Sequence, residues 1–188
     1  MDGQTSLKGK ILIASPAIGD PRFDRAVIFV CAHSDEQAMG ITINKAVRDL
    51  RLPTLFEQLG IEGSIRVPDR PVLDGGPVDR DRGFVLHTSE FQADDATLPV
   101  GDGVGLTATK EILAAIASDD APRRSILALG YAGWGAGQLD DELQANAWLV
   151  ADPDEALIFD DGYDNKWTLA LNSLGVDPER LSGISGHA

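Results

Sequence analysis

Short apolar runs, separated by prolines, glycines and acidic turns, follow one another along this sequence and limit the folds that it can adopt. The runs have the length of a strand and are rich in β-branched residues, a pattern typical of buried strands. We expect strands at 10–14, within 23–32, and at 39–44, 71–74, 83–87, 103–108, 125–131, 147–150 and 156–159.

Helical periodicity is confined to a few short segments between these runs. Ile112, Leu113 and Ile116 recur at the spacing of an amphipathic helix, for example. We expect helices at 54–59, 109–118, 138–146 and 165–174. Strands and helices do not alternate regularly, so the pattern favours an α+β fold over a doubly wound sheet.

The whole chain, residues 1–188, is expected to form a single domain. Its length of 188 residues suits one domain, and its hydrophobic content of 43% can supply a core. No repeat, low-complexity segment or linker divides the sequence. We expect residues 1–6 and 180–188 to be flexible, because chain ends commonly are.

Cysteine content and hydropathy indicate a cytoplasmic protein. The single cysteine, Cys31, excludes an intramolecular disulfide, as is usual in a reducing compartment. The apolar run ILIA near the N-terminus is shorter than the core of a signal peptide. No window approaches the roughly 20 apolar residues of a membrane helix, so we expect no membrane association.

The charge balance is strongly acidic, with 16 basic and 30 acidic residues and a net charge of −14. Such a chain repels phosphate backbones, and non-specific nucleic-acid binding depends on basic patches. No pair of predicted helices resembles a helix-turn-helix. Direct nucleic-acid binding is therefore kept only as an alternative function, one that requires a concentrated local basic face.

One pair of residues suggests nucleophilic chemistry. Cys31 and His33 lie two positions apart at the end of a predicted strand, where residues i and i+2 share a face. A neighbouring imidazolium would lower the pKa of the thiol, so a hydrolase using this pair is a second alternative. The structural interpretation is favoured, because a lone cysteine after the run VIFV is more often a small buried hydrophobe.

We expect neither a metal nor a cofactor. The three histidines, His33, His87 and His187, do not form the i, i+4 pair of a helical zinc site. The segment GYAGWGAG at 130–137 lies between a predicted strand and a predicted helix, but its glycine spacing matches neither nucleotide-binding fingerprint. The acidic residues that follow from Asp140 would repel a phosphate at that helix start.

Five stretches of the sequence are distinctive when taken together and in order. They are LKGKILIASPAIGDPRFDRAVIFVCAH at 7–33, MGITINKAV at 39–47, DGGPV at 74–78, GFVLH at 83–87 and GYAGWGAGQLDDELQANAWL at 130–149. In this arrangement the chain resembles the AlgH/YqgE family of bacterial proteins over residues 7–174.

The resemblance implies a single-domain α+β fold with a small barrel-like mixed sheet and flanking helices. A role in transcriptional regulation is proposed for this family, and the resemblance extends that expectation to this chain. The resemblance implies no established reaction and no catalytic residues. Asp140 departs from the family pattern, which usually has Glu at this helix start; the change keeps the negative charge.

The leading hypothesis is a non-catalytic regulatory or adaptor protein that binds an unidentified protein partner or small ligand. We expect its binding groove where the loop at 15–23, the GGPV turn and the GYAGWG turn meet, with exposed Phe23, Tyr131 or Trp134 as aromatic contacts. The candidate binding residues are Pro16, Pro21, Phe23, Arg25, Asn44, Gly75, Gly76, Pro77, Tyr131, Trp134 and Gln138.

Overall fold

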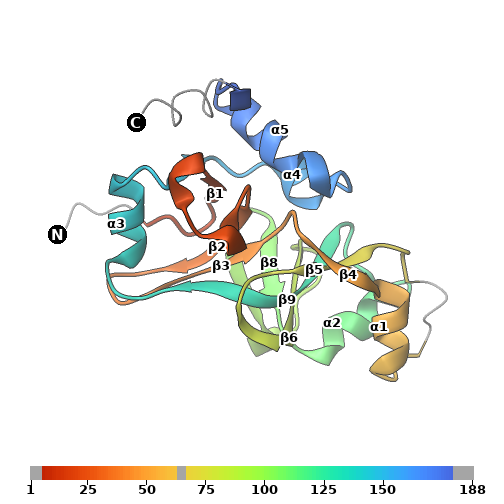
Figure 1. The fold of residues 1–188 in the computed structure, drawn as a ribbon. Coiled ribbons are helices and arrows are strands. Elements are labelled where there is room, and N and C mark those ends of the chain that lie inside the picture. Colours follow the sequence, from red (N-terminus) through yellow and green to blue (C-terminus); the bar gives the residue numbers. More distant parts are fainter. Residues whose placement is uncertain (1–5, 63–66, 180–188) are drawn as a thin grey trace.

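A mixed sheet with helices around it makes up the fold of this chain (Figure 1). The computed structural model describes residues 6–62 and 67–179. Apart from Ser6, the ends that the sequence predicts to be flexible lie outside the described residues. The strands are β1 Ile11–Ala14, β2 Val27–His33, β3 Ala38–Thr42, β4 Ala46–Arg51, β5 Pro71–Asp74, β6 Val78–Thr88, β7 Thr97–Gly101, β8 Val104–Thr107, β9 Ser125–Trp134 and β10 Trp148–Ala151. The helices are α1 Leu52–Gln58, α2 Lys110–Ile116, α3 Gln138–Gln144, α4 Glu155–Phe159 and α5 Lys166–Ser173.

The sheet is strongly curled. Its strands run in the order β10-β1-β2-β3-β9-β6-β8-β7, and β5, which pairs with β4, joins the sheet at β9. All described pairs are antiparallel except β5 with β9. The last strand in this order, β7, packs back against β2. The sheet therefore forms a half-barrel with a concave inner face and a convex outer face.

Apolar side chains pack on both faces of the half-barrel. The inner core joins residues of β1, β2, β3, β6, β8 and β9 to residues of α4 and α5. On the outer face, α3 covers the β1–β2–β3 end, whereas α1 and α2 cover β5, β6 and β9 (Figure 1). In the described ranges, no helix combines the length and the apolar character that crossing a membrane requires.

The observed fold confirms the predicted α+β class, but one of the predicted strands is a helix. Residues 156–159 were expected to be a strand, but they belong to the helix α4. Asp154 precedes this helix and its side chain accepts a hydrogen bond from the Ala156 amide at 3.0 Å, which is an N-cap. An apolar run this short fits a buried helix as well as a strand, and the cap decides between them.

Two strands have no counterpart in the prediction. β4 is largely exposed and rich in charge, so it lacks the apolar pattern of a strand. β7 lies within 88–102, a stretch without diagnostic features, and contains Pro99, which a strand tolerates only near an edge. Both strands owe their conformation to the neighbouring strand rather than to their own sequence.

A buried lysine connects the two C-terminal helices to the half-barrel. Lys166, the first residue of α5, is fully buried. Its Nζ donates hydrogen bonds to the carbonyl oxygens of Ile43, at 3.0 Å, and Ile158, at 2.7 Å. Burial lowers the pKa of this amine from 10.5 to about 7, although the nearby carboxylates of Asp160 and Asp161 act to raise it.

We predict that Lys166 makes the stability of the protein rise with pH above neutrality. Its pKa is about 7 in the folded chain and 10.5 in the unfolded chain, so the unfolded chain binds more protons between these values. The free energy of unfolding should therefore increase by up to about 1.4 kcal/mol per pH unit, and Lys166→Met should remove that increase. Urea denaturation between pH ~7 and ~7.8 measures it, below the pKa of about 8.5 at which a thiol of the unfolded chain ionises.

The matched control is Lys110→Met, because Lys110 is the first residue of α2 but is exposed. This variant should keep the pH dependence of the wild type. Equal slopes for the wild type and Lys166→Met would contradict the prediction.

Candidate functional site

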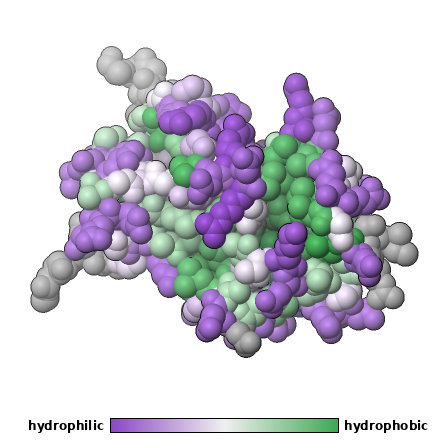
Figure 2. All heavy atoms as spheres, turned by 90° about the horizontal axis from the view of Figure 1, so that it is seen from below, coloured by the Kyte–Doolittle hydropathy of each residue, from purple (hydrophilic) through white to green (hydrophobic). Residues whose placement is uncertain are grey.

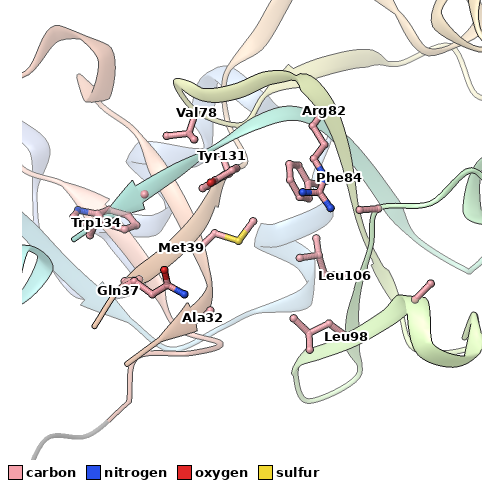
Figure 3. A pocket seen from close by; sticks show the side chains of 14 residues that line it. Ala32, Gln37, Met39, Val78, Arg82, Phe84, Leu98, Leu106, Tyr131 and Trp134 are labelled. Atoms are coloured by element: carbon pink, nitrogen blue, oxygen red, sulfur yellow. The ribbon is translucent and has the colours of Figure 1, made fainter. Parts of the chain in front are cut away.

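An apolar cavity opens on the inner face of the half-barrel (Figure 3). Its volume is about 540 Å³, within the range typical of ligand pockets. Seen from below, the surface of the protein shows apolar areas hollowed between ridges of hydrophilic side chains (Figure 2). The cavity is lined by Ala32, Gln37, Ala38, Met39, Val78, Arg82, Phe84, Ala96, Leu98, Leu106, Ala108, Tyr131, Gly133 and Trp134.

Aromatic contacts organise one wall of this cavity. The rings of Phe84 and Tyr131 meet edge to face, with their centroids 5.7 Å apart. The guanidinium of Arg82 lies over the same Phe84 ring, with Cζ 5.2 Å from the centroid. Met39 extends between Tyr131 and Leu106 toward the middle of the cavity (Figure 3).

A second, smaller cleft of about 150 Å³ lies where the loop at 15–23 meets the GGPV turn. Its lining includes Phe23, Gly76 and Pro77, three of the residues that the sequence predicts for binding. Two of the cations beside it are neutralised locally, because Arg22 pairs with Asp20 and Arg80 with Asp74 at 2.8 and 2.9 Å. The third, Lys45, donates to the carbonyl oxygen of Asp24 at 2.7 Å. Asp20 also caps the short turn that carries Phe23.

The glycines of the GGPV turn permit close contact with β9. A Cβ atom on Gly75 would lie 2.3 Å from the carbonyl oxygen of Gly130, and one on Gly76 would lie 2.2 Å from the backbone of Tyr131. Both distances are impossible for a side chain, so the two segments can pack together only with glycine at these positions.

Several other predicted binding residues have structural contacts instead. Pro16 and Pro21 begin short 3₁₀ turns. The Asn44 side chain accepts a hydrogen bond from the Val27 amide at 2.9 Å and donates one to the carbonyl of Arg25 at 2.8 Å. It thereby fixes Arg25, which has a left-handed backbone with φ of 55°. The guanidinium of Arg25 lies 5.3 Å from the ring centroid of Trp167.

Trp134 is not the exposed aromatic that we predicted, because only 5% of it is accessible. Its Nε1 donates to Glu142 at 3.0 Å, and Nε1 of Trp148 donates to the same carboxylate oxygen at 2.8 Å. Gln138 donates to the other oxygen of Glu142 at 3.0 Å. One edge of Trp134 still reaches the cavity, while Phe23 and Tyr131 are half-buried.

The expected single groove is thus divided into two. Phe23, Gly76 and Pro77 line the smaller cleft, whereas Tyr131 and Trp134 line the half-barrel cavity. The backbone contact between the GGPV turn and β9 separates these spaces. Sequence reasoning did not single out the remaining cavity residues, although the alternation of the predicted strand at 39–44 places Met39 on the same side as Ile41 and Ile43 of the inner core.

Cys31 and His33 do not form a catalytic pair. Cys31 is fully buried in the inner core, and burial raises the pKa of its thiol to about 12. A bulge in β2, where the pairing shifts between Val30 and Ala32, breaks the alternation. Ala32 therefore lines the cavity together with its partner Met39, while His33 pairs with Ala38 on the outer side.

His33 has its own contacts on that outer side. Its Nδ1 accepts a hydrogen bond from the amide of Leu7 at 2.9 Å, and Nε2 lies 3.8 Å from Asp140. The prediction that the thiol and the imidazole share a face was wrong, because the i, i+2 rule holds only for an uninterrupted strand.

Among the described residues, no group of three or more His, Cys, Asp or Glu side chains could hold a metal ion. His87 is buried, with Nε2 at 2.8 Å from the hydroxyl of Thr107 and Nδ1 at 2.9 Å from the carbonyl of Thr88. Burial lowers the pKa of His87 and keeps it neutral at pH 7. His187 lies outside the described residues.

Comparison with known proteins assigns the chain to a family. A family model described as AlgH-like matches residues 11–179, so the chain belongs to the AlgH-like family. It is 51% identical to a UPF0301 protein of Caulobacter vibrioides, over 97% of this chain and 94% of the relative. A UPF0301 protein of Bradyrhizobium diazoefficiens is 52% identical, over 97% of this chain and 88% of the relative.

Two solved structures are similar in fold. The solution structure of the AlgH protein from Pseudomonas aeruginosa has a TM-score of 0.77 and 36% identity, covering 97% of this chain and 96% of that protein. The crystal structure of a protein from Corynebacterium diphtheriae has a TM-score of 0.72 at 19% identity, with 92% and 90% coverage, and supports the fold alone. The names of these proteins state no reaction.

We predict that Cys31 is inert in the folded protein. Because the thiol is buried and its pKa is raised to about 12, iodoacetamide should modify it about 100-fold or more slowly than in urea-denatured chains. Mass spectrometry after timed alkylation at neutral and mildly alkaline pH measures this ratio.

The control moves the thiol by one residue. In a Cys31→Ala, Ala32→Cys variant the sulfur would face the cavity and should react readily without denaturant. Fast alkylation of native wild-type protein would overturn the assignment of Cys31 to the core.

Proposed function

We propose that this protein is a non-catalytic binding protein with a regulatory or adaptor role, and that the half-barrel cavity is its binding site. The observation that supports this most directly is the composition of the cavity, which is open, largely apolar and of ligand size.

The chemistry of the lining favours binding over catalysis. The only side chains there with polar groups that a ligand can reach are Gln37, Arg82 and Tyr131, because Trp134 already donates to Glu142. The Cys31 thiol is buried beneath the inner face. No nucleophile with an adjacent base faces the cavity, so a hydrolase function has no observation in its favour.

The alternative of direct nucleic-acid binding receives no support either. The cavity walls are apolar, and two of the three cations of the smaller cleft pair with carboxylates. A role in transcriptional regulation would therefore act through a bound partner or ligand. We place the protein in the cytoplasm on the basis of its sequence.

We predict that a charge at the cavity mouth weakens apolar binding. Leu98 lines the cavity and is 48% exposed, so Leu98→Asp can be made without disturbing the core. The neutral dye Nile red should bind the wild type at one site, and the substitution should weaken that binding about tenfold. Fluorescence titration measures the dissociation constants.

The matched control is Leu169→Asp on α5, since Leu169 is also 48% exposed but lies outside the cavity. It should bind Nile red as the wild type does. Absence of binding, or equal effects of both substitutions, would contradict the proposal. The same pair then tests partners captured from the native cell, which should be lost with Leu98→Asp only.

A further inference from the structure

We propose that the half-barrel cavity binds a small amphipathic carboxylate, with its apolar chain inside the cavity and its carboxylate on Arg82. This inference rests on the proposed function and names the class of ligand. Three independent observations support it: the charge distribution of the lining, the absence of an ion pair at Arg82 among the described residues, and the pairing of β3 on both sides.

The charge of the lining is opposite to that of the protein. The chain has 30 acidic and 16 basic residues. Nevertheless, Arg82 is the one charged residue among the 14 that line the cavity, all of which the structure describes. Although the protein is acidic, the lining of this cavity therefore contains one cationic side chain and no carboxylate. That arrangement attracts an anion and disfavours cationic ligands.

Arg82 is available for an anion. Arg80, two residues earlier on β6, donates to the Asp74 carboxylate at 2.9 Å. Arg82 makes no such ion pair in the part of the chain that the structure describes, and its guanidinium lies on the Phe84 ring instead. A guanidinium stacked in this way keeps its N–H groups at its edge, where they can form a bidentate pair with a carboxylate.

The groups around Arg82 suit the remainder of such a ligand. The Tyr131 ring contacts the opposite side of the Phe84 wall, so an apolar chain leaving Arg82 would pass over aromatic surface. Beyond it, Met39 and Leu106 line the path, and the flexible Met39 side chain can adapt to ligands of different shape (Figure 3).

A peptide fits the cavity less well than a small molecule. Along the lining, β3 is paired on both sides at Ala38 and Met39, whereas β6 pairs with β8 only from Val85 onward. The strand β3 therefore offers no free edge to the backbone of a peptide. An extended peptide would bury amide groups against apolar walls without partners, which is costly. A fatty-acid-like molecule has polar atoms only at its end.

The test uses Met39 as a reporter inside the cavity. The chain contains two methionines, Met1 and Met39, so methyl-¹³C-methionine labelling of the full chain gives two methyl signals. The Met39 signal should shift on titration with decanoate, below its micelle concentration. Decanol, which has the same chain without the charge, should bind about tenfold more weakly, and decyltrimethylammonium more weakly still.

Arg82→Gln should reduce decanoate affinity about tenfold, to the level of decanol, and leave decanol affinity unchanged. Arg80→Gln is the matched control and should change neither affinity.

If decanoate and decanol bind alike and Arg82→Gln has no effect, the carboxylate inference is wrong while the apolar binding site stands. If no ligand shifts Met39, both are wrong. Tighter binding of a short apolar peptide than of decanoate would also overturn the small-ligand assignment.

Discussion

The left-handed backbone of Gly130, with φ of 78°, is the constraint on which the arrangement of this half-barrel depends. Before it, Ile126 and Ala128 of β9 face the inner core while Leu127 faces outward. Strict alternation would put Tyr131 on the side of Leu127, but Tyr131 packs on the inner core. The kink at glycine reverses the alternation, as in a bulge, and so directs Tyr131 into the cavity.

This position admits only glycine for two reasons. The backbone angle is unfavourable for other residues, and a Cβ atom would lie 2.4 Å from the carbonyl oxygen of Gly76. The contact locks the GGPV turn onto β9 and separates the half-barrel cavity from the smaller cleft. A second irregularity, the bulge in β2, keeps the Cys31 thiol in the core and His33 on the outer side. The result is a cavity with apolar walls and a single charged residue, Arg82, in its lining.

Part of this arrangement was predictable from the residues alone. The strand formed by Ile11–Ala14 and the helix that begins at Gln138 follow from apolar pattern and turn residues, because their local preferences agree with the fold. The strand β7 was not predictable, since Pro99 and a polar neighbourhood conceal it. The burial of Trp134 was also hidden, because it depends on Glu142, eight residues later, accepting hydrogen bonds from two indoles at once.

By itself, the sequence determined the α+β class, the order of most elements, and, through five motifs in a fixed order, membership of the AlgH-like family. Hydrophobic periodicity carries that information because it records which face of each element is buried. Only the tertiary structure decided which side chains share a cavity. The reason is physical: a single bulge or left-handed glycine reverses every side chain that follows it on a strand, and contacts between distant segments decide where such irregularities occur.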